Sequence, residues 1–225
     1  MQSLFVLPLR EQVALTTLLT QTHRHYHNIN HVNDCLTELY QYYLNTENKN
    51  MSHIQAMILT YMIWYHDAIY NPYSPSGLNE EQSAILYSSE DYSPTIRHAI
   101  RATADHVRTQ EDNPSSNPSF GEWPLTKIML DIDLSGFGKP MHVYANNSMN
   151  IRREYYNTTN IDFVKGRLAF LQRINQRESF YYTDYFRDLY HSKSKENVAL
   201  EIAALQHAAT ENDPNIYFER LFTYF

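Results

Sequence analysis

The sequence predicts an all-α protein, and three observations support this fold class. Apolar residues recur at helical spacing in successive segments, beginning with Leu9, Val13, Leu15, Leu18 and Leu19. Apolar and polar residues almost never alternate with a period of two, which disfavours β-strands. The 225 residues include only five glycines, too few for a β protein with many tight turns.

The second helix is indicated by a cap and an apolar face. Asn28 is a suitable N-cap, because its side-chain oxygen can accept a hydrogen bond from a free amide of the first turn. One face of the following segment carries Val32, Leu36, Leu39 and Tyr43. We therefore expect a helix to begin directly after Asn28.

The strongest periodic run lies in the next segment and extends from Ser52 to about Tyr70. Pro72, Pro75 and Gly77 then end the helical pattern in a loop. The same periodicity predicts further helices over residues 79–89, 94–108, 124–134, 139–156, 161–172 and 193–209.

Composition and charge limit the classes of function. One domain spanning residues 1–225 is expected, because no linker or internal repeat divides the chain. The net charge of −7, with charged residues dispersed, disfavours a dedicated nucleic-acid surface. No glycine-rich nucleotide-binding motif occurs, and Cys35 is the only cysteine, so no disulfide can form within the chain. Without a visible signal peptide or a long apolar stretch, we expect a cytoplasmic protein with no membrane partner.

The adjacent pair His66–Asp67 is the first candidate for a metal site. It interrupts a strongly apolar helix near its end. Neighbouring side chains on a helix point about 100° apart, so the two could hold one ion from two sides. A satisfied polar pair at a helix end is the alternative for this dipeptide taken alone.

Other residues strengthen the metal interpretation. His31 lies near the start of a predicted helix, and Asp131 and Asp133 interrupt a later apolar run. A carboxylate on a buried helix has to be paired or bound to a metal, because burying it alone costs too much free energy. Imidazole and carboxylate ligands suit Mn, Mg, Co, Ni, Fe or Zn ions and leave positions open for solvent.

Six short motifs occur in a fixed order between about residues 22 and 206. They read RHYHNINH at 24–31, WYHDAIY at 64–70, NEEQSA at 79–84, TADH at 103–106, DIDLSG at 131–136 and IRREY at 151–155. In this order they resemble a bacterial subfamily of the HD-superfamily metal-dependent phosphohydrolases. The resemblance implies one HD-type bundle of about eight to ten helices, with a motif-bearing core at about 22–206.

The resemblance also implies a set of metal ligands. These are His31, His66, Asp67 and one carboxylate of the DID segment. The last aspartate of the superfamily aligns better with Asp133 than with Asp131. The two point about 200° apart on a helix, so only one can face the ion, and we expect Asp133.

A hydrolytic reaction would need further groups around the metal-activated water. Besides acting as a ligand, Asp67 could orient that water. Glu80 is the first candidate for a general acid or base and His106 the second. An acidic residue in a first helical turn also interacts favourably with the helix dipole, so Glu80 could have that role alone.

Phosphate groups of a substrate would need donors beyond the metal. Arg24, His27 and Arg152 are the candidates, because arginine can form two parallel hydrogen bonds to phosphate oxygens. Arg152 could instead pair with a carboxylate such as Glu154 as internal scaffolding.

The function that the resemblance implies is hydrolysis of a phosphate ester or phosphoanhydride in a nucleotide or related small molecule. Two alternatives stay open from the sequence. A dinuclear iron oxygenase would need extra histidines, for which only His98 and His106 are available. A non-catalytic nucleotide-binding module would retain the pocket without turnover.

Overall fold

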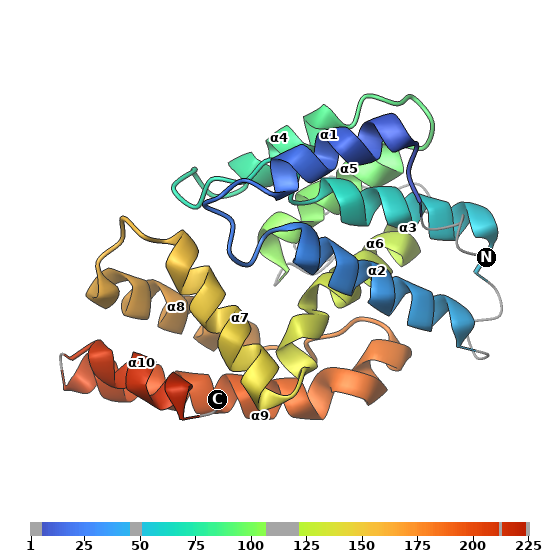
Figure 1. Ribbon diagram of the computed structural model, residues 1–225. Helices are drawn as coiled ribbons and strands as arrows, with labels where there is room; N and C mark the ends of the chain where they lie inside the picture. Colours follow the sequence, from blue (N-terminus) through green and yellow to red (C-terminus); the bar gives the residue numbers. More distant parts are fainter. Residues whose placement is uncertain (1–5, 46–50, 107–121, 212, 224–225) are drawn as a thin grey trace. The chain divides into compact units, whose positions relative to one another are not determined.

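The computed structural model describes residues 6–45, 51–106, 122–211 and 213–223 (Figure 1). These residues form ten α-helices and two short 3-10 helices, and no strand occurs among them. The prediction of an all-α protein is therefore confirmed.

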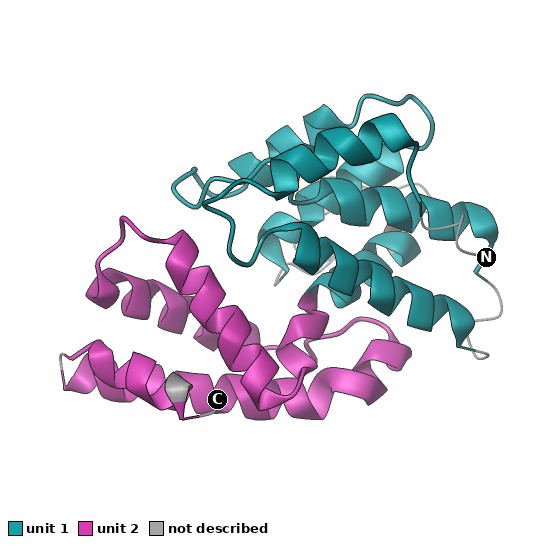
Figure 2. Ribbon diagram, viewed as in Figure 1, with its two compact units in different colours: residues 1–133 teal, residues 134–225 magenta. Residues whose placement is uncertain are grey.

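The chain divides into two compact units, residues 1–133 and 134–225 (Figure 2). The division falls inside a single helix, α6 (Glu122–Leu134). The sequence showed no linker there because the helix is continuous and apolar through this point. Each unit is described by itself below.

The first unit contains the helices that carry the motifs from Arg24 to Asp133. They are α1 (Leu9–Leu19), α2 (Ile29–Leu44), α3 (His53–Tyr65), α4 (Leu78–Leu86), α5 (Ser93–Ala102), the 3-10 helix η3 (Thr103–Asp105) and α6 up to Asp133. Helix α3 packs against α2, α4 and α5. Its side chains Leu59, Met62 and Ile63 are fully buried, so α3 is central to the core of this unit.

Both ends of α3 have local causes. Ser52 and Gln55 form a capping box at the start, in which each side chain accepts from the other's backbone amide. The helix ends at Tyr65, earlier than the predicted end near Tyr70, and the amide of His66 makes its last bond, to Met62. Beyond His66 the amide of Ala68 bonds to the carbonyl oxygen of Tyr65, and the amides of Ile69 and Asn71 then bond to side chains of Ser83 and Asn79.

Helix α2 begins directly after Asn28, as predicted. The Asn28 side chain accepts a hydrogen bond of 2.8 Å from the amide of Asn30. It also donates to the carbonyl oxygens of His25 and Arg24. Asn28 thus joins the first turn of α2 to the segment before it.

The second unit begins with the last residue of α6. It contains the 3-10 helix η5 (Ser135–Gly138), α7 (Met141–Glu154), α8 (Asn160–Asn175), α9 (Asp184–Thr210) and α10 (Asn215–Phe222). Helix α9 packs against η5, α8 and α10. The sequence predicted only its later part, 193–209, and did not predict α10.

A buried polar network joins four helices of the second unit. The carboxylate of Glu201 on α9 accepts two hydrogen bonds from the Arg167 guanidinium, at 3.0 and 3.2 Å. It also accepts from the hydroxyls of Tyr144, Ser148 and Tyr217. Every donor is uncharged except Arg167, so the network contains one ion pair surrounded by hydroxyl groups.

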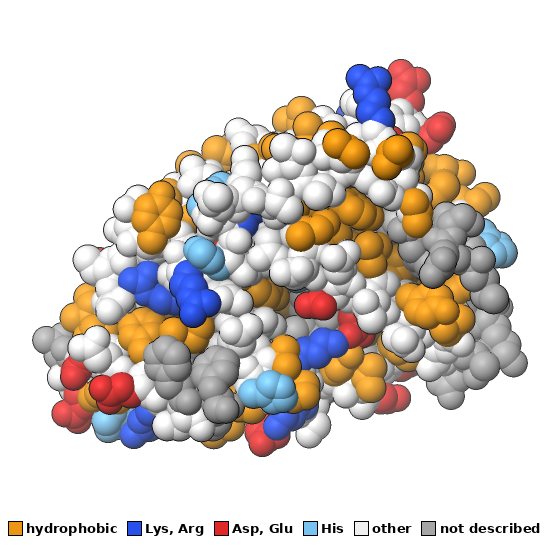
Figure 3. Space-filling model, viewed as in Figure 1, with side chains coloured by type: hydrophobic (Ala, Val, Ile, Leu, Met, Phe, Trp, Pro, Cys, Tyr) orange, Lys and Arg blue, Asp and Glu red, His pale blue; other side chains and the backbone are white. Residues whose placement is uncertain are grey.

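On the face drawn in Figure 3, the Lys and Arg side chains of the described residues lie dispersed among polar and hydrophobic ones. Some large apolar side chains are exposed, among them Leu9 and Val13 of α1. No helix in the described ranges has the length and apolar character needed to cross a membrane.

Candidate metal centre

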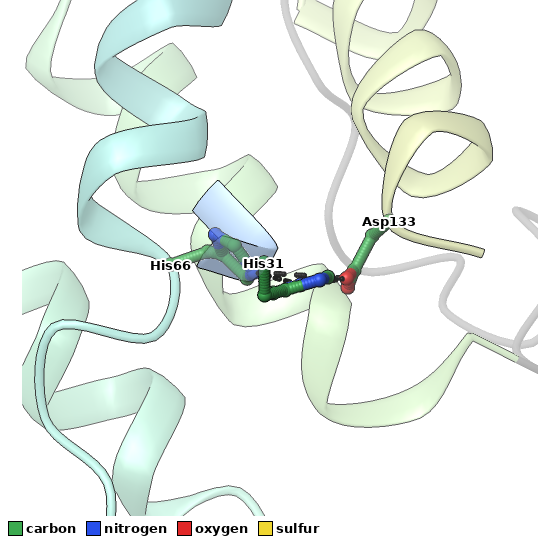
Figure 4. Close-up of side chains that lie close together, drawn as sticks. All are labelled: His31, His66 and Asp133. Atoms are coloured by element: carbon green, nitrogen blue, oxygen red, sulfur yellow. Dashed lines mark hydrogen bonds and ion pairs between the residues drawn. The ribbon is translucent and has the colours of Figure 1, made fainter. Parts of the chain in front are cut away.

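Two histidines meet where α2 begins and α3 ends. His31 lies in the first turn of α2, and His66 is the residue at which α3 stops. The packing of α2 on α3 brings their Nε2 atoms within 3.3 Å (Figure 4). Both residues are buried, with 7% and 1% of their surfaces exposed. Two imidazole nitrogens are therefore directed at the same small volume.

The orientation of the His66 ring is set by its own helix. Its Nδ1 lies 2.8 Å from the carbonyl oxygen of Ile63. A carbonyl oxygen only accepts hydrogen bonds, so Nδ1 carries a proton. In the neutral ring the lone pair is then on Nε2, which is the atom facing His31. Metal-binding histidines usually donate their other N–H in this way.

Two carboxylates complete the group around the histidines. Asp133 Oδ1 lies 3.0 Å from His31 Nε2 and 3.6 Å from His66 Nε2. Asp67 Oδ2 lies 3.0 Å from His66 Nε2 and 3.7 Å from His31 Nε2. One ligand atom each from His31, His66 and Asp133 lies within 4.8 Å of the other two. All four residues belong to the first unit.

One oxygen in this cluster lacks a hydrogen bond. Asp67 Oδ2 is buried, and no well-aligned donor among the described residues reaches it, although His66 Nε2 is only 3.0 Å away. A buried carboxylate oxygen without a donor is unfavourable unless a cation neutralises it. The donor set of two imidazoles and two carboxylates fits a divalent metal ion.

The charged groups of the cluster shift one another's pKa values. Burial disfavours a charge on His66, but the carboxylates of Asp67 and Asp133 outweigh this effect and hold its pKa well above the usual value. Burial likewise opposes ionisation of the two carboxyls, yet the nearby histidines, chiefly His66, keep the pKa of both below the usual value. The carboxylates are therefore ionised, and a bound cation would take the place of a proton on His66.

Asp131 and Asp133 lie in one unbroken helix, α6. The prediction that only one of them can face the ion assumed such a helix. The structure brings the carboxylate of Asp133 to the histidines. Asp131 is fully buried two residues earlier.

The two candidates for a general acid or base are placed differently. His106 follows η3, and its Nε2 lies 2.8 Å from Asp133 Oδ2, whereas His31 contacts the other carboxylate oxygen, Oδ1. Its side chain is 16% exposed, more than that of His31 or His66. Glu80 lies half-buried in the first turn of α4, and no hydrogen bond or ion pair among the described residues links it to the cluster.

The three predicted phosphate ligands also differ. His27 stacks on Tyr70 with ring centroids 4.3 Å apart, and its ring centroid lies 6.3 Å from that of His31. Arg24 is buried, and its guanidinium bonds to backbone carbonyl oxygens of the segment after His66. Arg152 lies in the second unit, where its guanidinium bonds to the side chain of Asn160 and to two backbone carbonyls.

Sequence reasoning did not single out Cys35 as a neighbour of the site. Its Sγ lies 3.7 Å from His31 Nε2, one helical turn along α2. The spacing of four residues on a predicted helix was the available signal, because such residues share a face.

Comparison with known proteins adds no relative. No family model matches the chain, and no match is found among curated proteins or among solved structures.

Proposed function

We propose that this protein is a metal-dependent phosphohydrolase that cleaves a phosphate ester or phosphoanhydride of a nucleotide or similar small molecule. A divalent cation would be held by His31, His66, Asp67 and Asp133. The observation that carries this proposal is the convergence of two imidazole Nε2 atoms and two ionised carboxylates in one buried place. The Oδ2 of Asp67, which is buried and accepts no hydrogen bond, supports a cation there.

The ligand set and the motif order together support the reaction type. A divalent cation at this place would lower the pKa of a water molecule and polarise a phosphoryl oxygen. Four protein ligands of the imidazole and carboxylate type leave room for solvent and substrate. The HD-type motifs favour phosphorus as the centre attacked.

The chain's own residues would share the remaining tasks. Asp67 would orient the attacking water, since its Oδ2 lies beside the histidines and accepts no hydrogen bond. His106 is supported over Glu80 as the proton carrier, because its ring contacts Asp133 and is partly exposed. His27, beside His31, is the best-supported phosphate donor of the three candidates.

The proposal is tested by assaying the purified full chain on a panel of nucleotides and phosphate esters. Mn²⁺, Co²⁺, Ni²⁺ or Mg²⁺ is added, and release of phosphate or pyrophosphate is measured. We expect hydrolysis that needs the metal and is abolished by His66→Ala and by Asp67→Ala. His53→Ala is the matched control, because His53 is an exposed histidine at the opposite end of α3.

Elemental analysis of the same preparations separates the alternatives. We expect one ion per chain in the wild type and in His53→Ala, and none in His66→Ala. Two iron ions per chain would favour a dinuclear oxygenase instead. Stoichiometric metal with no hydrolysis across the panel would overturn the hydrolase proposal and leave a binding module.

A further inference from the structure

The segment that follows His66 is held by side chains from distant parts of the chain. From Asp67 to Asn71 each backbone carbonyl oxygen meets a side-chain nitrogen or hydroxyl at 2.6 to 3.3 Å. The pairs are Arg24 with Asp67 and with Ala68, Ser83 with Ile69, His23 with Tyr70, and Asn79 with Asn71. Side chains thus replace the helical ladder that ends at Tyr65.

Arg24 supplies the contacts nearest to Asp67. Its Nη1 donates to the carbonyl oxygen of Asp67 at 2.6 Å and to that of His27 at 3.0 Å, and its Nη2 donates to that of Ala68 at 2.8 Å. Its Nε donates to the Gln21 side chain at 3.3 Å. Only 5% of Arg24 is exposed. The planar fork of a guanidinium can reach two successive carbonyls at once, which an ammonium cannot do with the same geometry.

Asp67 depends on these contacts more than His66 does. His66 is fixed by α3 itself, through its amide to Met62 and its Nδ1 to Ile63. Asp67 lies beyond the helix, and its backbone carbonyl is held by Arg24. The direction of its carboxylate toward the histidines therefore depends on where Arg24 places the backbone.

We propose that Arg24 is a positioning residue that fixes the Asp67 carboxylate against His31 and His66, and that it does not bind a substrate phosphate. This inference rests on the proposed metal site. At least four of the five N–H groups of the guanidinium are used within the protein. Three of those four bonds go to backbone carbonyl oxygens, so Arg24 acts on the site through the position of the backbone.

The experiment compares Mn²⁺ binding by the metal-stripped full chain with that of Arg24→Lys. Loss of a group that orients a metal ligand typically weakens the affinity by about 10- to 100-fold. We expect a loss of this size in Arg24→Lys. Arg97→Lys is the matched control, because Arg97 also donates twice to a backbone carbonyl, that of Tyr87 at the end of α4.

A second measurement tests the backbone of residues 66–71 directly. Hydrogen exchange followed by mass spectrometry should be faster in Arg24→Lys over residues 66–71 and unchanged there in Arg97→Lys. Arg24→Gln, which keeps one planar amide donor, is compared in the same way if the lysine variant unfolds. Inorganic phosphate binding to the Mn²⁺-saturated variants should equal that of the wild type.

The outcomes separate the two proposals. Absence of Mn²⁺ binding by the wild type overturns the proposed function and is seen before any variant is compared. Unchanged Mn²⁺ affinity in the Arg24 variants, or an equal loss in Arg97→Lys, overturns the positioning role. Unchanged Mn²⁺ affinity with weakened phosphate binding would assign Arg24 to the substrate instead.

Discussion

At the scale of single residues, His66 shows how a helix end can prepare a ligand. The residue closes α3, so the carbonyl oxygen of Ile63, three residues earlier, lies within reach of its Nδ1. The helix therefore provides the acceptor that defines which ring nitrogen carries the proton. No second side chain is needed for this task, and the Nε2 atom is left for the cluster.

Substitution of the two aspartates of α6, Asp131 and Asp133, should have different effects. Asp133→Asn should abolish stoichiometric binding of a divalent ion, because it removes the charge that faces the histidines. Asp131→Asn should keep the ion and lower the free energy of unfolding by about 1–3 kcal/mol, as expected for a changed buried polar group. Elemental analysis and urea unfolding measure the two effects. Equal metal loss in both variants would contradict the choice of Asp133.

The sequence predicted the residues whose role comes from the charge or metal affinity of their own side chains. His66 and Asp67 are candidates from their polarity at the end of an apolar helix, and His31 and Asp133 from the ordered motifs, and the structure brings the four together. The contacts of Arg24 could not be predicted. Three of its four acceptors are backbone carbonyl oxygens, which every residue carries and which no sequence pattern marks.

At the scale of helices, most elements with a clear local signal in the sequence were predicted, and one that depends on contacts with another segment was not. Helices α2 and α3 carry clear caps, at Asn28 and Ser52, and each begins at the residue after its cap. Helix α10 has only eight residues, too few to be stable alone, and depends on the contact of Tyr217 with Glu201. The first turns of α9 carry Phe186, Leu189 and Tyr190 at helical spacing, so the sequence held a signal there that the prediction missed.

The caps of α2 and α3 form a matched pair for experiment. Asn28→Ala and Ser52→Ala should each lower the free energy of unfolding by about 1 kcal/mol, the usual value of an N-cap. Only Asn28→Ala should also weaken metal binding, because His31 lies in the turn that Asn28 caps. Ser52 caps the end of α3 opposite to His66. Urea unfolding and metal titration of both variants provide the comparison, and equal metal affinities would contradict it.

At the scale of the whole molecule, each compact unit contains a buried cluster of charged side chains, around His66 in the first and around Glu201 in the second. In the second unit, burial disfavours the charge of Glu201, but Arg167 outweighs it, with help from the tyrosine hydroxyls, and the pKa of Glu201 lies below its usual value of 4.5. A carboxyl whose pKa is lower in the folded state stabilises the fold above its unfolded pKa. That stability is lost as the pH falls through the folded value.

The network therefore predicts acid sensitivity that depends on Glu201. The free energy of unfolding should decrease as the pH falls below about 4.5, and this decrease should be smaller in Glu201→Gln. At neutral pH, Arg167→Met should cost about 3–5 kcal/mol, because it leaves a buried carboxylate unpaired. Lys165→Met, an exposed site on α8, is the control. Urea unfolding across pH measures both effects, and an identical acid slope in Glu201→Gln would be the contrary result.

The thiol of Cys35 would serve as a chemical probe of the metal centre. Cys35 is 1% exposed beneath His31, and burial, together with the Asp133 and Asp67 carboxylates, holds the pKa of its thiol well above the usual value. While α2 stays folded, an added disulfide reagent meets neither an accessible sulfur nor a thiolate. Labelling would proceed only during openings of α2 around His31. The labelling rate would therefore measure how often α2 opens. A metal ion bound at the centre would stabilise the folded state, so the labelling rate would decrease as the centre is filled.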